Sequence, residues 1–139
     1  MKPKTLDFSG SNVKNFFFTY IRRQIEYSFI FNNGKIVPHT DGRSKLLSLL
    51  MFFPEGLDGE KEIGTTFWES NIKNLNNEHL KNNEREKKFK ENNKILTKLP
   101  FSKYDLYGFI RNSKSWHSVE PFYLGKDYIR RSININFYF

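Results

Sequence analysis

Hydrophobic and polar residues alternate most clearly over the segment from Tyr128 to Phe139. One side of this segment carries Ile129, Arg131, Ile133, Ile135 and Phe137, and the other side carries Arg130, Ser132, Asn134, Asn136 and Tyr138. A period of two residues is typical of a β-strand, because successive side chains of a strand point to opposite faces. This segment is therefore the clearest predicted strand in the chain.

Several other short segments are rich in β-branched and aromatic residues and also predict strands. They are Tyr27–Phe31, Lys35–His39, Lys45–Phe53, Gly64–Trp68, Tyr104–Arg111 and Trp116–Val119. Asn32-Asn33-Gly34 separates the first two and is a strong turn signal, so these two segments are predicted to pair as a hairpin. Pro54-Glu55-Gly56 ends the third segment, which is apolar enough to be a buried strand.

Two stretches of the chain depart from the strand pattern. Apolar residues from Val13 to Ile25 recur every three or four positions, which predicts a helix. Residues 70–98 are rich in Lys, Asn and Glu, and Leu75, His79 and Leu80 lie at helical spacing within them, which favours an exposed helix or a mobile lid. We therefore expect one mostly-β domain over residues 1–139, with an N-terminal helix and a polar, partly helical insertion.

The composition excludes some classes of site and leaves others open. The 139 residues include no cysteine, which excludes disulfides, thiolate zinc sites, iron–sulfur clusters and a cysteine nucleophile. The net charge of +8 permits binding to nucleic acid or an acidic partner, but it is equally the charge of a solvated surface. The start of the chain lacks the apolar stretch of a secretion signal, and the apolar runs are too short to span a bilayer. We expect a soluble, cytoplasmic protein that does not bind membranes.

The histidines are few, and two of them stand where they could bind a metal ion. His39-Thr40-Asp41 lies at the end of a predicted strand, where the side chains of positions i and i+2 point the same way. His117 lies at the edge of another predicted strand. Two histidines and one carboxylate form the facial triad of non-haem Fe(II) oxygenases. A His-x-Asp triplet alone is a weak signal, because such short motifs also arise by chance. His79 is predicted to be a surface residue.

The residues around this triplet add a more specific pattern. In order, the chain contains Pro38-His39-Thr40-Asp41, Leu46–Pro54, Gly64-Thr65-Thr66-Phe67, Ser115–Pro121 and Arg130–Phe137. Together these segments resemble the double-stranded β-helix core of the 2-oxoglutarate- and Fe(II)-dependent oxygenases, in particular the prolyl-hydroxylase-like branch, over about residues 27–139. The resemblance implies that His39, Asp41 and His117 bind Fe(II), and that 2-oxoglutarate and O2 are co-substrates.

The resemblance also implies a binding site for 2-oxoglutarate on the last strand. An arginine two positions before a serine binds the distal carboxylate in this family, and Arg130 and Ser132 fit that pattern. Adjacent side chains face opposite ways, so the register of the strand decides between Arg130 and Arg131, and we favour Arg130 because the polar residues share its face. Phe52 stands where many relatives have a tyrosine that reaches the co-substrate. Ser48 is a candidate to replace the missing hydroxyl.

The implied reaction is hydroxylation of a C–H bond in an amino-acid, peptidyl or small-molecule substrate, with succinate and CO2 as co-products. Trp116 is expected to pack beside the metal ligand, and the substrate contacts are expected from residues 54–63 and 70–98. The main alternative is a non-catalytic basic β-barrel that binds nucleic acid or an acidic partner through Lys81–Lys98. A cupin-like sugar-binding or isomerase barrel shares the fold, but it would not need an arginine on the last strand. The short segment before the core leaves open a minimal enzyme, a fragment, or a protein that needs a partner.

Overall fold

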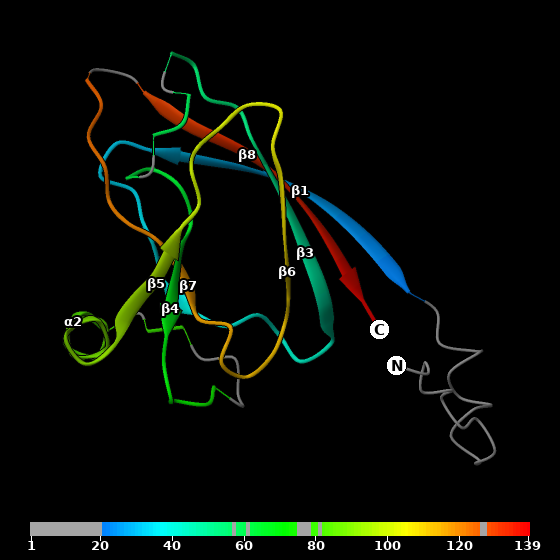
Figure 1. The fold of residues 1–139 in the computed structure, drawn as a ribbon, viewed down its shortest axis with the longest axis vertical. Helices are drawn as coiled ribbons and strands as arrows, with labels where there is room; N and C mark the ends of the chain where they lie inside the picture. Colours follow the sequence, from blue (N-terminus) through cyan, green and yellow to red (C-terminus); the bar gives the residue numbers. More distant parts are fainter. Residues whose placement is uncertain (1–20, 57, 61, 75–78, 81, 126–127) are drawn as a thin grey trace, which may run out of the picture.

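Two four-stranded antiparallel sheets form the framework of the described part of the chain (Figure 1). The computed structural model describes residues 21–56, 58–60, 62–74, 79–80, 82–125 and 128–139. The first sheet, which we call the major sheet, has the order β1 (Arg22–Phe31), β8 (Ile129–Tyr138), β3 (Lys45–Phe52) and β6 (Leu106–Ile110). The second, the minor sheet, has the order β2 (Ile36–His39), β7 (His117–Val119), β4 (Thr66–Glu69) and β5 (Lys94–Lys98). The prediction of a mostly-β chain is confirmed.

The main apolar core lies between the two sheets. Ile30, Leu50 and Phe52 reach it from the major sheet, and Val119 reaches it from β7. The segments between strands add Ile63, Phe101 and Phe122. The side chains of this cluster are at most 8% exposed, so they form a packed core.

The alternation of β8 is confirmed, and its polar side is the buried one. Arg130, Ser132 and Asn136 are each less than 5% exposed, whereas the isoleucines on the opposite side of the strand are half-buried. β8 pairs along its whole length with β1 and over most of its length with β3. The centre of the major sheet therefore turns a row of polar side chains toward the minor sheet.

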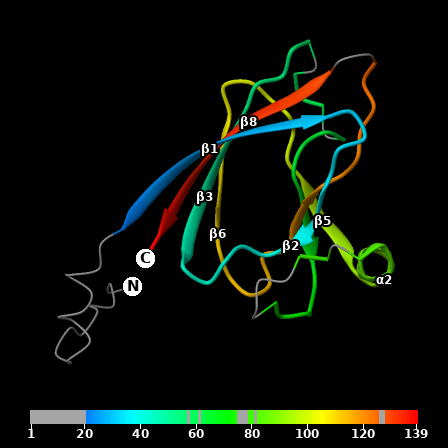
Figure 2. The ribbon, with the colours of Figure 1, turned by 180° about the vertical axis from the view of Figure 1, so that it is seen from behind.

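The hairpin predicted around Asn32-Asn33-Gly34 is wrong. The turn is present, with Asn33 at φ 62° and no space for a side chain at position 34, where a Cβ atom would lie 2.7 Å from the carbonyl oxygen of Phe31. Asn32 and Asn33, however, hydrogen-bond to the segment of residues 122–125. These bonds carry the chain across to the other sheet, so β1 pairs with β8 and β2 pairs with β7 (Figure 2).

The prediction of an N-terminal helix is wrong for its last residues. Residues 22–25 already belong to β1, and Ile25 pairs with Ile135 of β8. The aromatic and β-branched residues that follow alternate at period two, and pairing with β8 extends this strand toward the N-terminus. Residues 13–20 of the predicted helix lie outside the described residues.

The predicted polar insertion is only partly helical, and its last part belongs to a sheet. Helix α2 (Asn83–Asn92) begins after Asn82, whose side chain accepts hydrogen bonds from the backbone N–H groups of Glu84 and Arg85. Phe89 of this helix packs against Trp68 and Trp116. The segment from 94 to 98 is strand β5, which pairs with β4. This stretch is therefore part of the fold rather than a detached insertion.

The fold bears on two further predictions. Within the described residues, no helix has the length and apolar character needed to cross a membrane. The cytoplasmic location and the single domain over residues 1–139 stay predictions. Leu75, part of the predicted helical spacing with His79 and Leu80, lies outside the described residues, and those two residues are not helical.

Candidate metal centre

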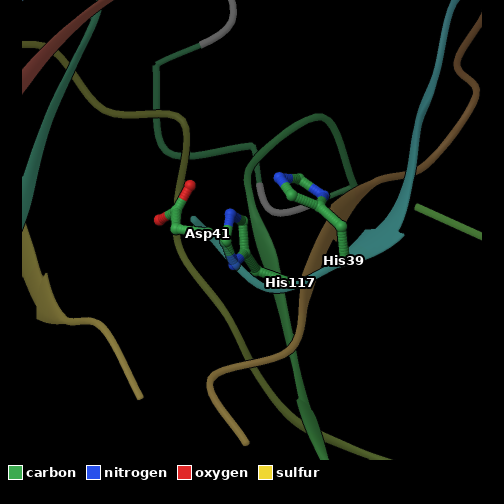
Figure 3. Close-up of side chains that lie close together, drawn as sticks. All are labelled: His39, Asp41 and His117. Carbon is green, nitrogen blue, oxygen red and sulfur yellow. The ribbon is translucent and has the colours of Figure 1, made fainter. Parts of the chain in front are cut away.

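The two histidines and the aspartate of the predicted triad lie together. His39 ends β2, His117 begins β7, and these two residues pair across the two strands. Asp41 follows β2 by two residues, so the chain brings its carboxylate back beside the His117 ring (Figure 3). One ligand atom from each of the three side chains lies within 4.8 Å of the other two. This spacing allows one metal ion to be bound by all three groups.

Both imidazole rings have the tautomer that metal binding requires. Nδ1 of His39 lies 2.9 Å from the carbonyl oxygen of Val37, and Nδ1 of His117 lies 3.0 Å from that of Ser115. A carbonyl oxygen only accepts, so each Nδ1 carries the hydrogen and donates it. The lone pair of each Nε2 is then free, and the backbone holds the orientation of each ring.

The protonation states of the three groups also suit a divalent cation. Burial, together with repulsion from His117 and His79, lowers the pKa of His39 to about 3. Burial likewise lowers the pKa of His117. Burial by itself would raise the pKa of Asp41, but attraction to His117 and the hydrogen bond from Lys45 outweigh it, so this pKa is also lowered. At neutral pH the site therefore presents two neutral imidazoles and one carboxylate, the forms that bind metals.

Asp41 is held in place by two side chains of β3. The ammonium group of Lys45 lies 2.8 Å from Oδ1 of Asp41, and both side chains are largely buried. The hydroxyl of Ser48 donates to Asn136 Oδ1 at 3.0 Å and also lies 3.4 Å from Oδ2 of Asp41. Lys45 thus occupies one carboxylate oxygen, and the other is only weakly contacted and is available to a metal ion.

A cavity of about 180 Å³ extends from this triad into the space between the sheets. Pockets for drug-sized ligands are typically about 300–1,000 Å³, so this cavity suits a small metabolite. Its walls combine the triad with polar side chains of the major sheet and apolar side chains of both sheets. They include Glu26, Ser28, Lys45, Ser48, Leu50, Phe52, Thr65, Val119, Arg130, Ser132, Asn134 and Asn136.

Arg130 is the deepest charged group in this cavity. It is 2% exposed, and its guanidinium donates to the carbonyl oxygen of Ile63 at 2.6 Å. Longer contacts of 3.4 and 3.5 Å reach the hydroxyls of Ser132 and Thr65. No carboxylate of the described residues forms an ion pair with it, and burial lowers its pKa to about 10. A buried guanidinium without a counter-charge is costly, so this arginine is suited to an anionic ligand.

The other residues predicted on the co-substrate side are distributed over the cavity. Arg131 faces the opposite side of the sheet and forms an ion pair with Glu55 at 2.5 Å. The Arg130 guanidinium lies over the ring of Phe52, with its central carbon 5.0 Å from the ring centre, so Phe52 stabilises the cation by a cation–π contact. Ser132 lies beside Arg130. Ser48 lies beside Asp41 and pairs with Asn136, which is six residues from Arg130 along β8.

His79, which the sequence predicts only as a surface residue, also lies at the site. It is exposed, as predicted, but its ring stacks on that of His39, with the ring centres 4.5 Å apart and the planes at 11°. A backbone hydrogen bond from the N–H group of Leu80 to the carbonyl oxygen of Pro38 holds this segment beside β2. All three histidines of the chain therefore meet at one place. No spacing in the sequence could have revealed it, because the contact joins a loop to a distant strand.

Trp116 is a buried packing residue, with neighbours on helix α2 and strand β4. It is 3% exposed, its indole N–H donates to the carbonyl oxygen of Ile72 at 2.7 Å, and it contacts Phe89 of α2. Trp116 thus belongs to a second apolar cluster, which anchors helix α2 behind the minor sheet.

Comparison of the sequence with protein-family models and with curated proteins found no match.

Proposed function

We propose that the chain is a 2-oxoglutarate- and Fe(II)-dependent dioxygenase, and that its two facing sheets form a double-stranded β-helix core. The reaction would hydroxylate a C–H bond of an amino-acid, peptidyl or small-molecule substrate, with succinate and CO2 as co-products. The observation that carries this proposal is the buried Arg130, which shares one cavity with the His39, Asp41 and His117 group and has no acidic partner among the described residues.

The three ligand side chains fit a divalent iron ion. Two neutral imidazoles and one carboxylate supply three protein ligands on one side of a metal and leave further positions for other molecules. When bound there, Fe(II) with 2-oxoglutarate and O2 supplies the oxidising chemistry. The backbone carbonyls of Val37 and Ser115 keep the two rings oriented, and Lys45 keeps the carboxylate ionised.

Arg130 fits a dicarboxylate that also reaches the metal. A guanidinium presents parallel N–H donors that match a carboxylate, and such pairs are strongest where water is excluded. Phe52 and Phe101 lie on the guanidinium at 5.0 and 5.3 Å from their ring centres and exclude water from it. A five-carbon dicarboxylate could bind Arg130 with one end and approach the triad with the other.

Asp41 bears on the outcome of the reaction. Relatives that transfer a halide have a small residue in place of the carboxylate ligand, and this chain retains the carboxylate. The site is therefore proposed to hydroxylate its substrate rather than to halogenate it.

The side chains of α2 and β5 favour the alternative, a basic binding module, less than the cavity favours a dioxygenase. Lys90 forms ion pairs with Glu86 and Glu120, and Lys98 forms one with Glu62. The aromatic residue of this stretch, Phe89, is buried against two tryptophans. A surface that binds nucleic acid needs accessible cations and aromatic rings on which bases can stack. Arg85, Lys88 and Lys94 are exposed cations of this stretch, but Lys90 and Lys98 are paired and the Phe89 ring is buried, so no ring of α2 or β5 is available for stacking.

Calorimetric titration with Mn(II) and then with 2-oxoglutarate tests the proposal. We expect Mn(II) to bind, 2-oxoglutarate to bind only to the metal-loaded protein, and succinate to be released when Fe(II) and air replace Mn(II). Binding of 2-oxoglutarate that does not depend on metal, or no binding at all, would contradict the proposal. Binding of DNA or RNA that weakens steeply with added salt, without any metal effect, would favour the binding module.

A further inference from the structure

A second charged group lines the same cavity and has no role in the chemistry described above. Glu26 lies half-buried on β1, on the side of the strand that faces the minor sheet. Its Oε1 accepts a hydrogen bond from the side-chain amide of Gln24 at 2.8 Å, and its Oε2 accepts one from that of Asn136 at 3.0 Å. Both donors are uncharged, so these two bonds orient the carboxylate without neutralising its charge.

Buried polar side chains connect Glu26 to the metal centre. Asn136 is 1% exposed; its Nδ2 donates to Glu26 and its Oδ1 accepts from Ser48. Ser48 in turn contacts the carboxylate of Asp41. Glu26 is therefore held at a fixed place relative to the metal ligands, as a side chain that positions a substrate must be.

The cations around Glu26 are engaged elsewhere. Lys45 pairs with Asp41 at 2.8 Å, and the guanidinium of Arg22 lies over the ring of Tyr138 at 4.9 Å. Arg130 lies opposite Ile30, four residues further along β1 and deeper in the cavity. Among the described residues, no lysine or arginine places a side-chain nitrogen within 4.0 Å of a carboxylate oxygen of Glu26. The part of the cavity at Glu26 is thus suited to a cation from outside the chain.

We propose that Glu26 binds a cationic group of the substrate, a primary ammonium or a guanidinium, and so selects an amine as the molecule to be hydroxylated. This inference rests on the proposed function, because it assumes that Arg130 takes the dicarboxylate. The cavity then binds opposite charges at two places along β8. Arg130 holds the anionic co-substrate at the deep end, and Glu26 holds the cation beside Asn136, which contacts the metal centre through Ser48.

The test compares cations with molecules of similar shape that lack one positive charge. The protein loaded with Mn(II) and 2-oxoglutarate is titrated with a series of n-alkylamines and with the matching n-alcohols as neutral counterparts. Lysine and arginine are compared with norleucine and citrulline, which keep the α-ammonium and α-carboxylate groups and lack only the side-chain charge. We expect at least one cation to bind about tenfold or more tightly than its neutral counterpart, as is typical for a partly buried ion pair. Equal affinity within every matched pair, or no binding of any cation, would overturn the inference.

Two variants locate the effect at Glu26. Glu26→Gln keeps the size of the side chain and one acceptor oxygen, which can still accept from Asn136, and removes the charge, so it should bring the ratio of cation to neutral affinity close to one. Glu62→Gln removes a carboxylate whose partner is Lys98 and which does not line this cavity, so it should leave the ratio unchanged. A cation preference that survives in Glu26→Gln, or is lost equally in Glu62→Gln, would contradict the proposed contact.

The same titrations separate this inference from the proposed function. If 2-oxoglutarate binds the metal-loaded protein but cations show no preference that depends on Glu26, the dioxygenase proposal stands and the amine inference fails. If cations bind through Glu26 while 2-oxoglutarate does not bind, the cation site stands and the dioxygenase proposal fails. Succinate release that increases with the preferred amine, and not with its neutral counterpart, would support both.

Discussion

The inner and outer faces of the major sheet differ in an unusual way: polar side chains are buried on the inner face beside the apolar Ile30, Leu50 and Phe52, and aromatic side chains are exposed on the outer face. On the inner face β8 buries Arg130, Ser132 and Asn136, whereas most sheets bury apolar side chains and expose polar ones. On the outer face of β1, Tyr27 is 70% exposed, Phe29 58% and Phe31 63%. Polar groups are buried here because the cavity uses them, and each one has hydrogen-bond partners within it.

The outer face presents a different physical problem. Its aromatic and aliphatic side chains lie on neighbouring strands, among them the exposed Leu106 and Ile110 on β6 and the half-buried isoleucines of β8. Contiguous apolar surface of this kind usually marks a place where something else packs. Changes on the two faces should therefore have different consequences: those on the inner face should affect ligand binding and stability, and those on the outer face should affect association.

The largest expected effect comes from the inner cavity at the metal centre. His117→Ala removes one of only three protein ligands, so Mn(II) binding measured by calorimetry should be lost and succinate release with it. Circular dichroism should still show a β-rich fold. Mn(II) affinity equal to that of the unchanged protein would mean that His117 is not a ligand.

Adjacent arginines on opposite faces allow a direct comparison. Arg130→Ala should weaken 2-oxoglutarate binding by about 2–5 kcal/mol, as expected when one side of a buried charge pair is removed. Arg131→Ala should change this affinity little, because Arg131 pairs with the exposed Glu55 on the outer side. Titration of the two Mn(II)-loaded variants measures both values. A larger loss in Arg131→Ala would reverse the assignment of the two faces.

Acid should lower the free energy of unfolding of the metal-free protein, because His39 is buried in its neutral form on the inner side. The pKa of His39 is lowered from 6.5 to about 3 in the folded protein, so between these values the unfolded chain binds a proton that the folded chain does not. Stability should then be complete above about pH 6.5 and should fall as the pH drops below it. Urea unfolding between pH 7 and pH 4 measures this, with His39→Gln as the control that should flatten the dependence. A stability that rises on acidification would contradict the burial of a neutral His39.

The smallest expected effects compare one polar position inside with one apolar position outside. Asn136→Ala removes the buried donor to Glu26 and the closer of the two acceptors of the Ser48 hydroxyl, so it should lower the free energy of unfolding by about 1–3 kcal/mol. Phe29→Ser on the outer face should change it by only about 0.5 kcal/mol, while it reduces self-association in sedimentation experiments. Urea unfolding gives the first two values. A greater loss of stability from Phe29→Ser would show that the outer face is covered within the folded chain.

Much of the strand content and part of the site could be predicted from the sequence. The alternation over Ile129–Tyr138 identified β8 and separated its two faces, because a strand directs neighbouring side chains to opposite sides whatever its surroundings. The same local rule brought His39 and Asp41 together as a pair. Their union with His117 followed from a resemblance over many segments, and the structure does bring the three side chains together.

The tertiary structure alone decided which segments pair and which face of each strand is buried. The turn at Asn33 is local, but the choice between a hairpin and a crossover depends on the hydrogen bonds of Asn32 and Asn33 to residues 122–125. The segment from 94 to 98 ends a stretch rich in Lys, Asn and Glu, and it becomes a strand because β4 offers an edge to pair with. The ion pair of Lys45 with Asp41 and the stacking of His79 on His39 also depend on how distant segments pack together. Contacts between distant segments leave no period in the sequence, because they depend on how the sheets pack and not on the conformation of either segment.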